Sequence, residues 1–218
     1  MHKSTPCIKQ MPGLRGLDPQ EVELLPPALQ DTYFAGCTNS PMFARYGVHG
    51  DGSCFFHSLC AGLNTSNYLQ LSSTEQQKVG QRFRCKFTEH ITDRRWHQFL
   101  KIKNISDKVD AETARNNFCN SKFWADETMI KYVSEVLKVN LIFIDVTTGK
   151  IYCGVRGRDE EPLIIILWID HSHFEPVFCV RGAQLDEQLL GGQFAFDMNK
   201  NSDVVRAVFK NYEAQCSA

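Results

Sequence analysis

The sequence contains no apolar segment long enough to cross a membrane. The longest aliphatic and aromatic run is LIIILWI at 163–169, whereas a transmembrane helix needs about 20 residues. The first residues, MHKSTPCIKQ, also lack the apolar stretch that follows the positive end of a secretory signal. We therefore expect a soluble, cytoplasmic protein that does not bind membranes.

Neither basic nor acidic side chains are in excess. The 218 residues include 24 basic and 25 acidic side chains, which gives a formal net charge of -1. Domains that bind nucleic acids usually carry a marked basic surplus, so we expect no nucleic-acid partner. Because 43% of the residues are hydrophobic, the chain can bury a core without a metal or cofactor, and we expect neither.

The nine cysteines include no C-x-x-C pair. A disulfide framework is not expected in an intracellular chain of this length. Most of the cysteines should therefore be small, buried apolar residues. Any cysteine that performs chemistry has to be distinguished by its surroundings.

Three parts of the chain differ in composition. Residues 1–44 are rich in proline and glycine and predict an extension, in which Pro26 and Pro27 end a short helix. Residues 45–181 predict a folded domain, and residues 182–218 predict a second extension that contains a helix.

Within the domain, apolar periodicity predicts helices first and strands later. The expected helices lie at 54–63, 72–93, 109–119 and 125–139, and the expected strands lie at 140–146, 151–155, 163–169 and 173–180. Helices that precede a group of strands favour an α+β fold over a regularly alternating α/β fold.

Cys54 stands in the segment HGDGSCFFHSLC at 49–60, directly after a glycine-rich turn. Ser53 is a suitable N-cap residue, so Cys54 is expected at the beginning of a helix. The unpaired amides at a helix N-terminus carry a partial positive charge, which favours the thiolate form of a cysteine. Cys54 is therefore the candidate nucleophile.

Gly50 and Gly52 predict a tight turn before that helix, because glycine adopts positive φ at little cost. Such a turn directs successive backbone amides into one concavity, which is suited to bind an oxyanion. The carboxylate of Asp51 is expected to hydrogen-bond within the turn. The same residues are also compatible with a purely structural Asx-turn that caps a helix.

A cysteine nucleophile needs a base, and the segment DHSHFEP at 170–176 is the best source of one. If this segment continues as a strand, His171, His173 and Glu175 project to one face. A carboxylate two residues after a histidine can then orient its imidazole ring.

A zinc site is the rival interpretation of these residues. Cys54, His57, His171 and His173 together form a possible ligand set. Structural zinc sites usually contain more sulfur ligands in short paired knuckles, and they do not require glycine on both sides of Asp51. Zinc is therefore the less favoured hypothesis.

Three segments together resemble the ovarian tumour (OTU) family of cysteine proteases. GDGSCFFHSL is similar to the family's D-G-x-C signature, SHFEPV to its late histidine motif, and FWADETMIKYVSEVLKVNLIFIDV to the segment between them. They occur in the family's order, and the resemblance covers about residues 44–181. It implies an OTU-like, papain-type fold with a small, mostly antiparallel sheet packed between helices.

The resemblance also implies a deubiquitinase, which hydrolyses isopeptide bonds at the C-terminus of ubiquitin without a metal. Matched by motif, Cys54 is the nucleophile, His173 the base and Asp51 the acid of the D-G-x-C turn. Glu175 occupies the position of the residue that orients the histidine ring, although the family usually has aspartate or asparagine there. Gly50, Gly52 and Ser53 supply the turn of the oxyanion site.

Ubiquitin, polyubiquitin chains and ubiquitin-like modifiers are the partners that this resemblance implies. Trp168 and Phe174 are candidates to line a narrow channel for the glycine-rich tail of the substrate. Compact relatives with such turns resemble those of large DNA viruses, which implies activity in the cytoplasm of a host cell. Two alternatives stay open, a non-catalytic OTU-like module that binds ubiquitin and an acyltransferase that uses the same residues.

Overall fold

The computed structural model describes residues 14–34, 42–106, 109–152, 161–180 and 205–210 of the chain. Most of the expected C-terminal extension lies outside this range, although residues 205–210 are helical. Among the described residues, no helix is both long enough and apolar enough to span a membrane.

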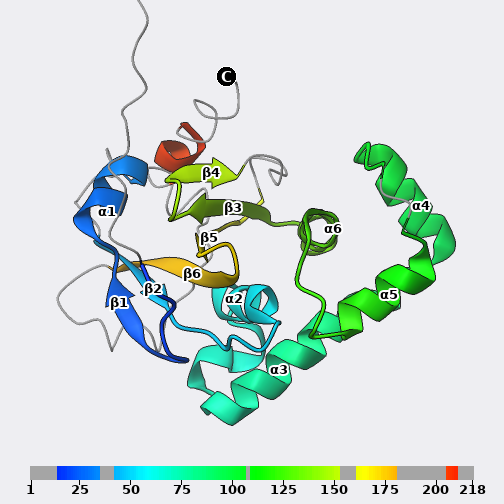
Figure 1. Ribbon diagram of the computed structural model, residues 1–218, viewed down its shortest axis with the longest axis horizontal. Helices are drawn as coiled ribbons and strands as arrows, with labels where there is room; N and C mark the ends of the chain where they lie inside the picture. Colours follow the sequence, from blue (N-terminus) through cyan, green and yellow to red (C-terminus); the bar gives the residue numbers. More distant parts are fainter. Residues whose placement is uncertain (1–13, 35–41, 107–108, 153–160, 181–204, 211–218) are drawn as a thin grey trace, which may run out of the picture.

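A six-stranded mixed sheet in the order β1-β2-β6-β5-β3-β4 forms the centre of the fold (Figure 1). The strands are β1 Val22–Leu24, β2 Met42–Tyr46, β3 Asn140–Asp145, β4 Lys150–Tyr152, β5 Leu163–Ile169 and β6 His173–Val180. Only β3 and β5 pair in parallel, and all other neighbours are antiparallel. The predicted α+β class and mostly antiparallel sheet are therefore confirmed.

Helices lie on both sides of this sheet. They are α1 Pro27–Tyr33, α2 Cys54–Gly62, α3 Ser73–Lys86, α4 Asp93–Ile102, α5 Ala111–Cys119 and α6 Glu127–Leu137, with short 3₁₀ helices at Thr65–Gln70 and Phe87–His90. In Figure 1, α2 lies between the sheet and α3, while α4 and α5 extend away from the sheet. Residues from α1 and from 205–209 join the core on the other face.

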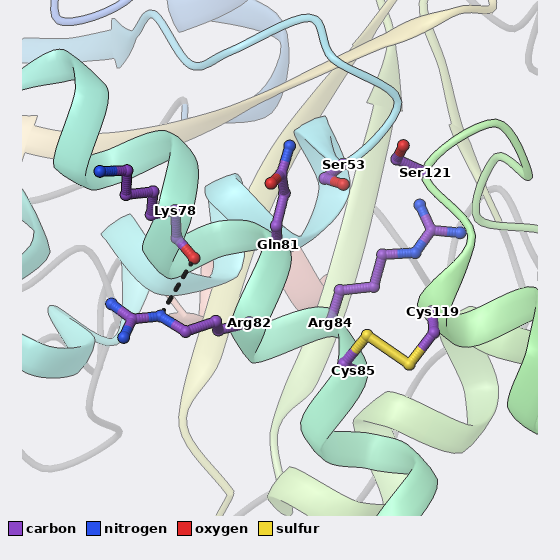
Figure 2. A pocket seen from close by; sticks show the side chains of 8 residues that line it. All are labelled: Ser53, Lys78, Gln81, Arg82, Arg84, Cys85, Cys119 and Ser121. Atoms are coloured by element: carbon purple, nitrogen blue, oxygen red, sulfur yellow. Dashed lines mark hydrogen bonds between the residues drawn. A yellow bond between two sulfur atoms is a disulfide. The ribbon is translucent and has the colours of Figure 1, made fainter.

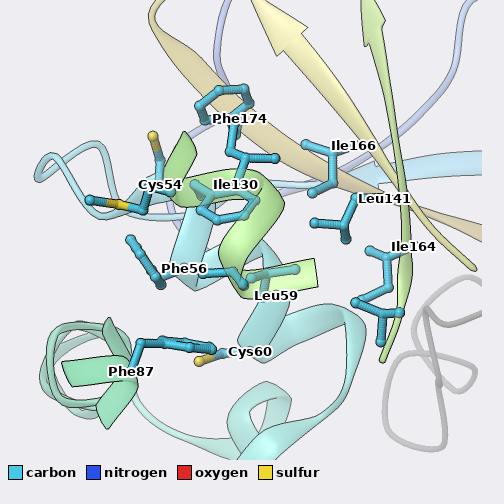
Figure 3. Close-up of a cluster of buried hydrophobic side chains, with 14 of the residues drawn as sticks. Cys54, Phe56, Leu59, Cys60, Phe87, Ile130, Leu141, Ile164, Ile166 and Phe174 are labelled. Carbon is cyan, nitrogen blue, oxygen red and sulfur yellow. The ribbon is translucent and has the colours of Figure 1, made fainter. Parts of the chain in front are cut away.

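The alternation of side chains along β5 builds two cores. Ile164 and Ile166 pack with α2 and α6 on one face, whereas Ile165 and Leu167 pack with α1 on the other. Complete burial of each aliphatic side chain contributes about 1.5–3 kcal/mol. The strand predicted to be buried on both faces is thus held from both sides. Figure 3 shows Cys54 and Phe174 at the border of the core that contains α2.

Part of the expected N-terminal extension contributes to the sheet. Strand β1 and most of β2 come from residues that the composition assigned to that extension. The prediction for the two prolines is wrong, because Pro27 is the first residue of α1 rather than the end of a helix. Proline is well suited to this position, where its fixed φ fits the helix and its missing amide is not needed.

The predicted helix at 72–93 is shorter than expected. Helix α3 begins with a capping box formed by Ser72 and Glu75 and ends at Lys86. A 3₁₀ helix follows, and α4 then starts after Thr92, whose side chain accepts a hydrogen bond from the Arg95 amide. Two local capping signals therefore divide a segment whose polar character suggested one continuous helix.

One pair of cysteines departs from the expected unpaired state. Cys85 in α3 and Cys119 at the end of α5 form a disulfide, with 4.7 Å between their Cα atoms. Among the cysteines within the described ranges, Cys54 and Cys60 are not part of a disulfide. Cys60 is buried in the core, and this burial raises the pKa of its thiol far above the usual range. Cys60 is therefore a packing residue, as predicted for most of the cysteines.

Candidate active site

Cys54 is the first residue of α2 and follows a turn whose shape depends on Gly52. The φ angle of Gly52 is +81°, and a Cβ at this position would collide with the carbonyl oxygen of Ser121. The Ser53 amide donates a 3.0 Å hydrogen bond to Oδ1 of Asp51, which forms the expected Asx-turn. Ser53 occupies the N-cap position, but its buried hydroxyl makes no capping hydrogen bond.

His173 is brought to Cys54 by the hairpin between β5 and β6. Asp170 and His171 both adopt positive φ, and the Ser172 amide closes the turn on the Ile169 carbonyl. Strand β6 then begins at His173 itself. The expectation that His171 shares a strand face with His173 is wrong, because the chain reverses direction between β5 and β6.

The imidazole of His173 is stabilised in its charged form. Burial lowers its pKa, but hydrogen bonding and charge interactions with Cys54 and Glu175 outweigh burial and raise the pKa from 6.5 to about 9. Nε2 of His173 lies 3.5 Å from Oε1 of Glu175, a distance typical of catalytic contacts before substrate binds. The three side chains thus form a row of thiol, imidazole and carboxylate.

Glu175 is completely buried and is held by two other donors. Its Oε1 accepts a 2.6 Å hydrogen bond from the Leu17 amide, and its Oε2 lies 3.0 Å from the Arg45 guanidinium. A buried carboxylate requires such partners, because its charge is costly to remove from water. Position 175 therefore carries a charged group that is fixed in place.

Asp51 contacts a different histidine. Its carboxylate lies 3.2 Å from Nε2 of His57 and accepts a hydrogen bond from Gln81. Although burial raises the pKa of Asp51, the hydrogen bonds and charge of its neighbours lower it to about 2. Nδ1 of His57 is 2.9 Å from the Tyr68 hydroxyl. Asp51 therefore anchors the turn to α2, and the contacts described for it do not include His173.

Two of the four side chains of the possible zinc set, His57 and His171, have partners other than Cys54 and His173. His57 is fully buried between Asp51 and Tyr68, whereas His171 is exposed in the hairpin turn and lies 3.9 Å from Asp145. In the part of the chain that the structure describes, no group of three or more histidine, cysteine or acidic side chains is arranged to hold a metal. The zinc hypothesis is therefore not supported.

Aromatic side chains flank Cys54. A narrow cavity of about 60 Å³ is lined by Cys54, Trp124, Trp168, His171 and Phe174, among others. The rings of Trp168 and Phe174 are stacked at 6.2 Å, while the side chain of Trp124 is 57% exposed. An adjoining apolar cavity of about 230 Å³ shares Trp168 and Phe174. The two candidate channel residues thus line both cavities beside Cys54.

Arg84 connects the turn before Cys54 to the segment 117–123. It is buried, and its guanidinium donates to the carbonyls of Gly52, Asn117, Phe118 and Phe123. Burial lowers its pKa to about 10, although the negative charges of Asp51 and Cys54 oppose that decrease. Figure 2 shows Arg84 beside the Cys85–Cys119 disulfide and a cavity of about 540 Å³ that Lys78 and Arg82 also line.

Sequence reasoning did not identify Arg84, Arg45, Trp124 or the Leu17 amide. Arg84 stands in the segment VGQRFRCKF, where neighbouring arginine and lysine residues conceal which cation is buried. The contacts of Arg45 and Leu17 with Glu175 link residues more than 100 positions apart, so no local pattern predicts them.

Known structures resemble this fold at low sequence identity. No family model matches the sequence, and no curated protein sequence is significantly similar to it. An OTU domain solved in complex with ubiquitin is similar over 81% of this chain and 88% of that chain, with a TM-score of 0.54 and 17% identity.

Two viral structures match with lower scores. The Hazara virus OTU bound to ubiquitin has a TM-score of 0.45 and 13% identity, with 64% of this chain and 83% of that chain covered. The viral OTU domain protease from Qalyub virus has a TM-score of 0.42 and 15% identity, with 73% and 100% covered. The similarity to the OTU domain solved with ubiquitin, at a TM-score of 0.54, defines the fold. This chain therefore has the fold of an OTU domain.

Proposed function

We propose that this protein is a cysteine protease that hydrolyses the bond between the carboxyl end of ubiquitin, or of a ubiquitin-like modifier, and an amine. One observation carries the proposal: Cys54 begins a helix and interacts with the half-buried imidazole of His173, and the fixed, fully buried carboxylate of Glu175 lies 3.5 Å from that imidazole. This arrangement provides an activated nucleophile, a proton carrier and an orienting group. The OTU fold and the ubiquitin complexes of similar structures support the choice of substrate.

The first half of the reaction forms a thioester. The Cys54 thiolate attacks the carbonyl carbon of the terminal glycine, and the carbonyl oxygen becomes negatively charged. The Ser53 amide already donates to Asp51, so the amides of Gly52 and Cys54 are the proposed donors to this oxyanion. Protonated His173 gives its proton to the lysine amine, and the carbon–nitrogen bond breaks.

The second half restores the enzyme. Neutral His173 removes a proton from water, and the resulting hydroxide attacks the thioester carbonyl. The carbon–sulfur bond breaks, which releases the Cys54 thiolate and a carboxylic acid that gives its proton to water. Glu175 stabilises the charged imidazole, and the cavity between Trp124 and Trp168 favours a tail without side chains. No metal or cofactor takes part in this scheme.

Ubiquitin carrying a thiol-reactive group at its C-terminus tests the proposal directly. Wild-type protein is expected to form a covalent adduct, Cys54→Ala none, and His173→Ala an adduct at a much lower rate. Cys60→Ala is the matched control. Because Cys60 is buried in the core, this substitution is expected to leave labelling unchanged. A folded wild type that binds ubiquitin but forms no adduct would indicate the non-catalytic module instead.

A further inference from the structure

The segment before β1 lies against the face of His173 and Glu175. Gly16 approaches the imidazole so closely that a Cβ there would lie 3.1 Å from Cδ2 of His173 and 3.7 Å from Oε1 of Glu175. The next residue, Leu17, is buried and donates its amide hydrogen to the same carboxylate oxygen. Two consecutive residues therefore contact two side chains of the proposed active site.

Arg45 fastens this segment to the site. Its guanidinium is 2% exposed, and the same Nη1 atom donates to the Arg15 carbonyl at 2.8 Å and to Oε2 of Glu175 at 3.0 Å. The other terminal nitrogen contacts Glu23, whose side chain is 48% exposed. One cation thus links the backbone of the segment, the buried carboxylate and β1.

The strand register explains how these groups meet. Arg45 in β2 pairs with Val177 in β6, and alternation along β6 places His173 and Glu175 on the same face as Val177. Arg45 therefore approaches Glu175 from the neighbouring strand. Without Arg45 and the Leu17 amide, a fully buried carboxylate would lack its two closest donors, and it would be free to turn away from His173.

We propose that residues 15–17, held in place by Arg45, belong to the active site. They fix the Glu175 carboxylate against His173 and restrict the position of the imidazole. Arg45 is a positioning residue in this arrangement, since it acts on His173 only through Glu175 and the segment. The inference rests on the proposed function for its role in turnover, but the geometry that it concerns is a property of the free protein.

Alkylation of Cys54 by iodoacetamide, followed by mass spectrometry across a pH series, tests the inference without any ubiquitin substrate. In full-length protein, Arg45→Met is expected to slow alkylation of Cys54 near neutral pH. The alkaline midpoint of the alkylation profile, at which His173 loses its proton, is expected to fall by about one pH unit or more. Turnover of a ubiquitin substrate should fall about 10- to 100-fold in kcat with little change in KM, because small displacements of reacting groups have effects of that size.

Gly16→Ala is the second variant, because it leaves the Arg45 contacts in place and only adds a methyl group beside the imidazole. It is expected to slow alkylation and turnover in the same direction. Arg45→Lys should restore part of the activity, since a lysine can reach one of the two acceptors. Arg94→Met is the control, because Arg94 is exposed in α4 and belongs to none of the contacts described for His173, Glu175 or Arg45; it should resemble wild type.

If folded Arg45→Met and Gly16→Ala show the same alkylation profile as the wild-type protein, the inference is overturned. If Arg45→Met does not fold, Gly16→Ala and Arg45→Lys decide by the same criterion. A wild type that shows the expected alkylation profile but no reaction with ubiquitin would overturn the proposed function and leave this inference in place.

Discussion

The guanidinium of Arg84 donates a 2.7 Å hydrogen bond to the carbonyl oxygen of Gly52, two residues before the candidate nucleophile. Replacement of Arg84 by methionine removes the donor of that bond and of the bonds to three further carbonyls. Because these carbonyls would lose a charged partner, we expect the free energy of unfolding to fall by about 3 kcal/mol or more. Urea denaturation measures the change.

The matched control for that variant is Arg82→Met, two residues earlier on the exposed side of α3. An exposed substitution of this kind should change stability by no more than about 0.5 kcal/mol. Equal stability of the two variants would show that the buried guanidinium does not hold the turn.

The raised pKa of His173 predicts an alkaline limit to activity. The proton on the imidazole is lost as pH rises through about 9, so kcat/KM for a ubiquitin substrate should decrease with a midpoint in that region. The same proton contributes to the free energy of unfolding. This contribution is complete below the pKa of histidine in the unfolded chain, about 6.5, and it disappears as pH rises through the folded-state pKa of about 9. A midpoint near 6.5 in the pH–rate profile would contradict the interaction with Cys54 and Glu175.

Glu175 and Asp51 are expected to have separable roles. Glu175→Gln should lower the alkaline midpoint of the pH–rate profile, because it removes a negative charge that raises the pKa of His173. Asp51→Asn should leave that midpoint in place, since Asp51 contacts His57 rather than His173. Profiles of the two variants measured side by side provide the check, and a shift in Asp51→Asn alone would reverse the assignment.

Asp51 is also expected to affect stability at low pH. The pKa of Asp51 in the folded protein is about 2. The contribution of its carboxylate to stability is therefore present above the pKa of aspartate in the unfolded chain, about 3.9, and is lost as pH falls through about 2. Thermal unfolding should therefore separate wild type from Asp51→Asn at neutral pH more than at low pH. A constant difference between them would argue against this linkage.

Two glycines of the turn form a matched pair of substitutions. Gly52→Ala requires a strained backbone and a collision with the Ser121 carbonyl, at a cost of about 1–3 kcal/mol, and should displace Cys54. In Gly50→Ala the new methyl group would lie 3.9 Å from Nδ1 of His173, which is an ordinary van der Waals contact. Thermal unfolding should therefore separate the two variants. Equal melting temperatures would show that the turn can relax around Gly52.

Local patterns predicted those parts of the fold that local interactions determine. Apolar periodicity identified α2, α5 and α6, and unbroken hydrophobicity identified β5 as a strand buried on both faces. The break between α3 and α4 was missed because capping by Ser72 and Thr92 competes with a weak apolar pattern. The position of β1 and β2 in the sheet depends on pairing with a strand far away in the sequence.

The side chains that support the candidate site were missed by the sequence analysis. Cys54, His173 and Glu175 come together as residue types and spacing suggested. The partner of Asp51 was not foreseen, because the choice between His57 and His173 depends on the path of the turn. Arg45 and Arg84 resemble other arginines until burial distinguishes them.

The hydrogen bond from Leu17 to Glu175 joins residues 158 positions apart. A ribosome synthesises the first partner early and the second only when the domain is nearly complete. During synthesis the thiol of Cys54 is therefore present long before its imidazole and carboxylate, and the reactive pair forms only when the two distant segments meet. In an unfinished chain the proposed nucleophile therefore lacks its proposed base, and the contact that joins them is of the non-local kind that forms slowly in folding.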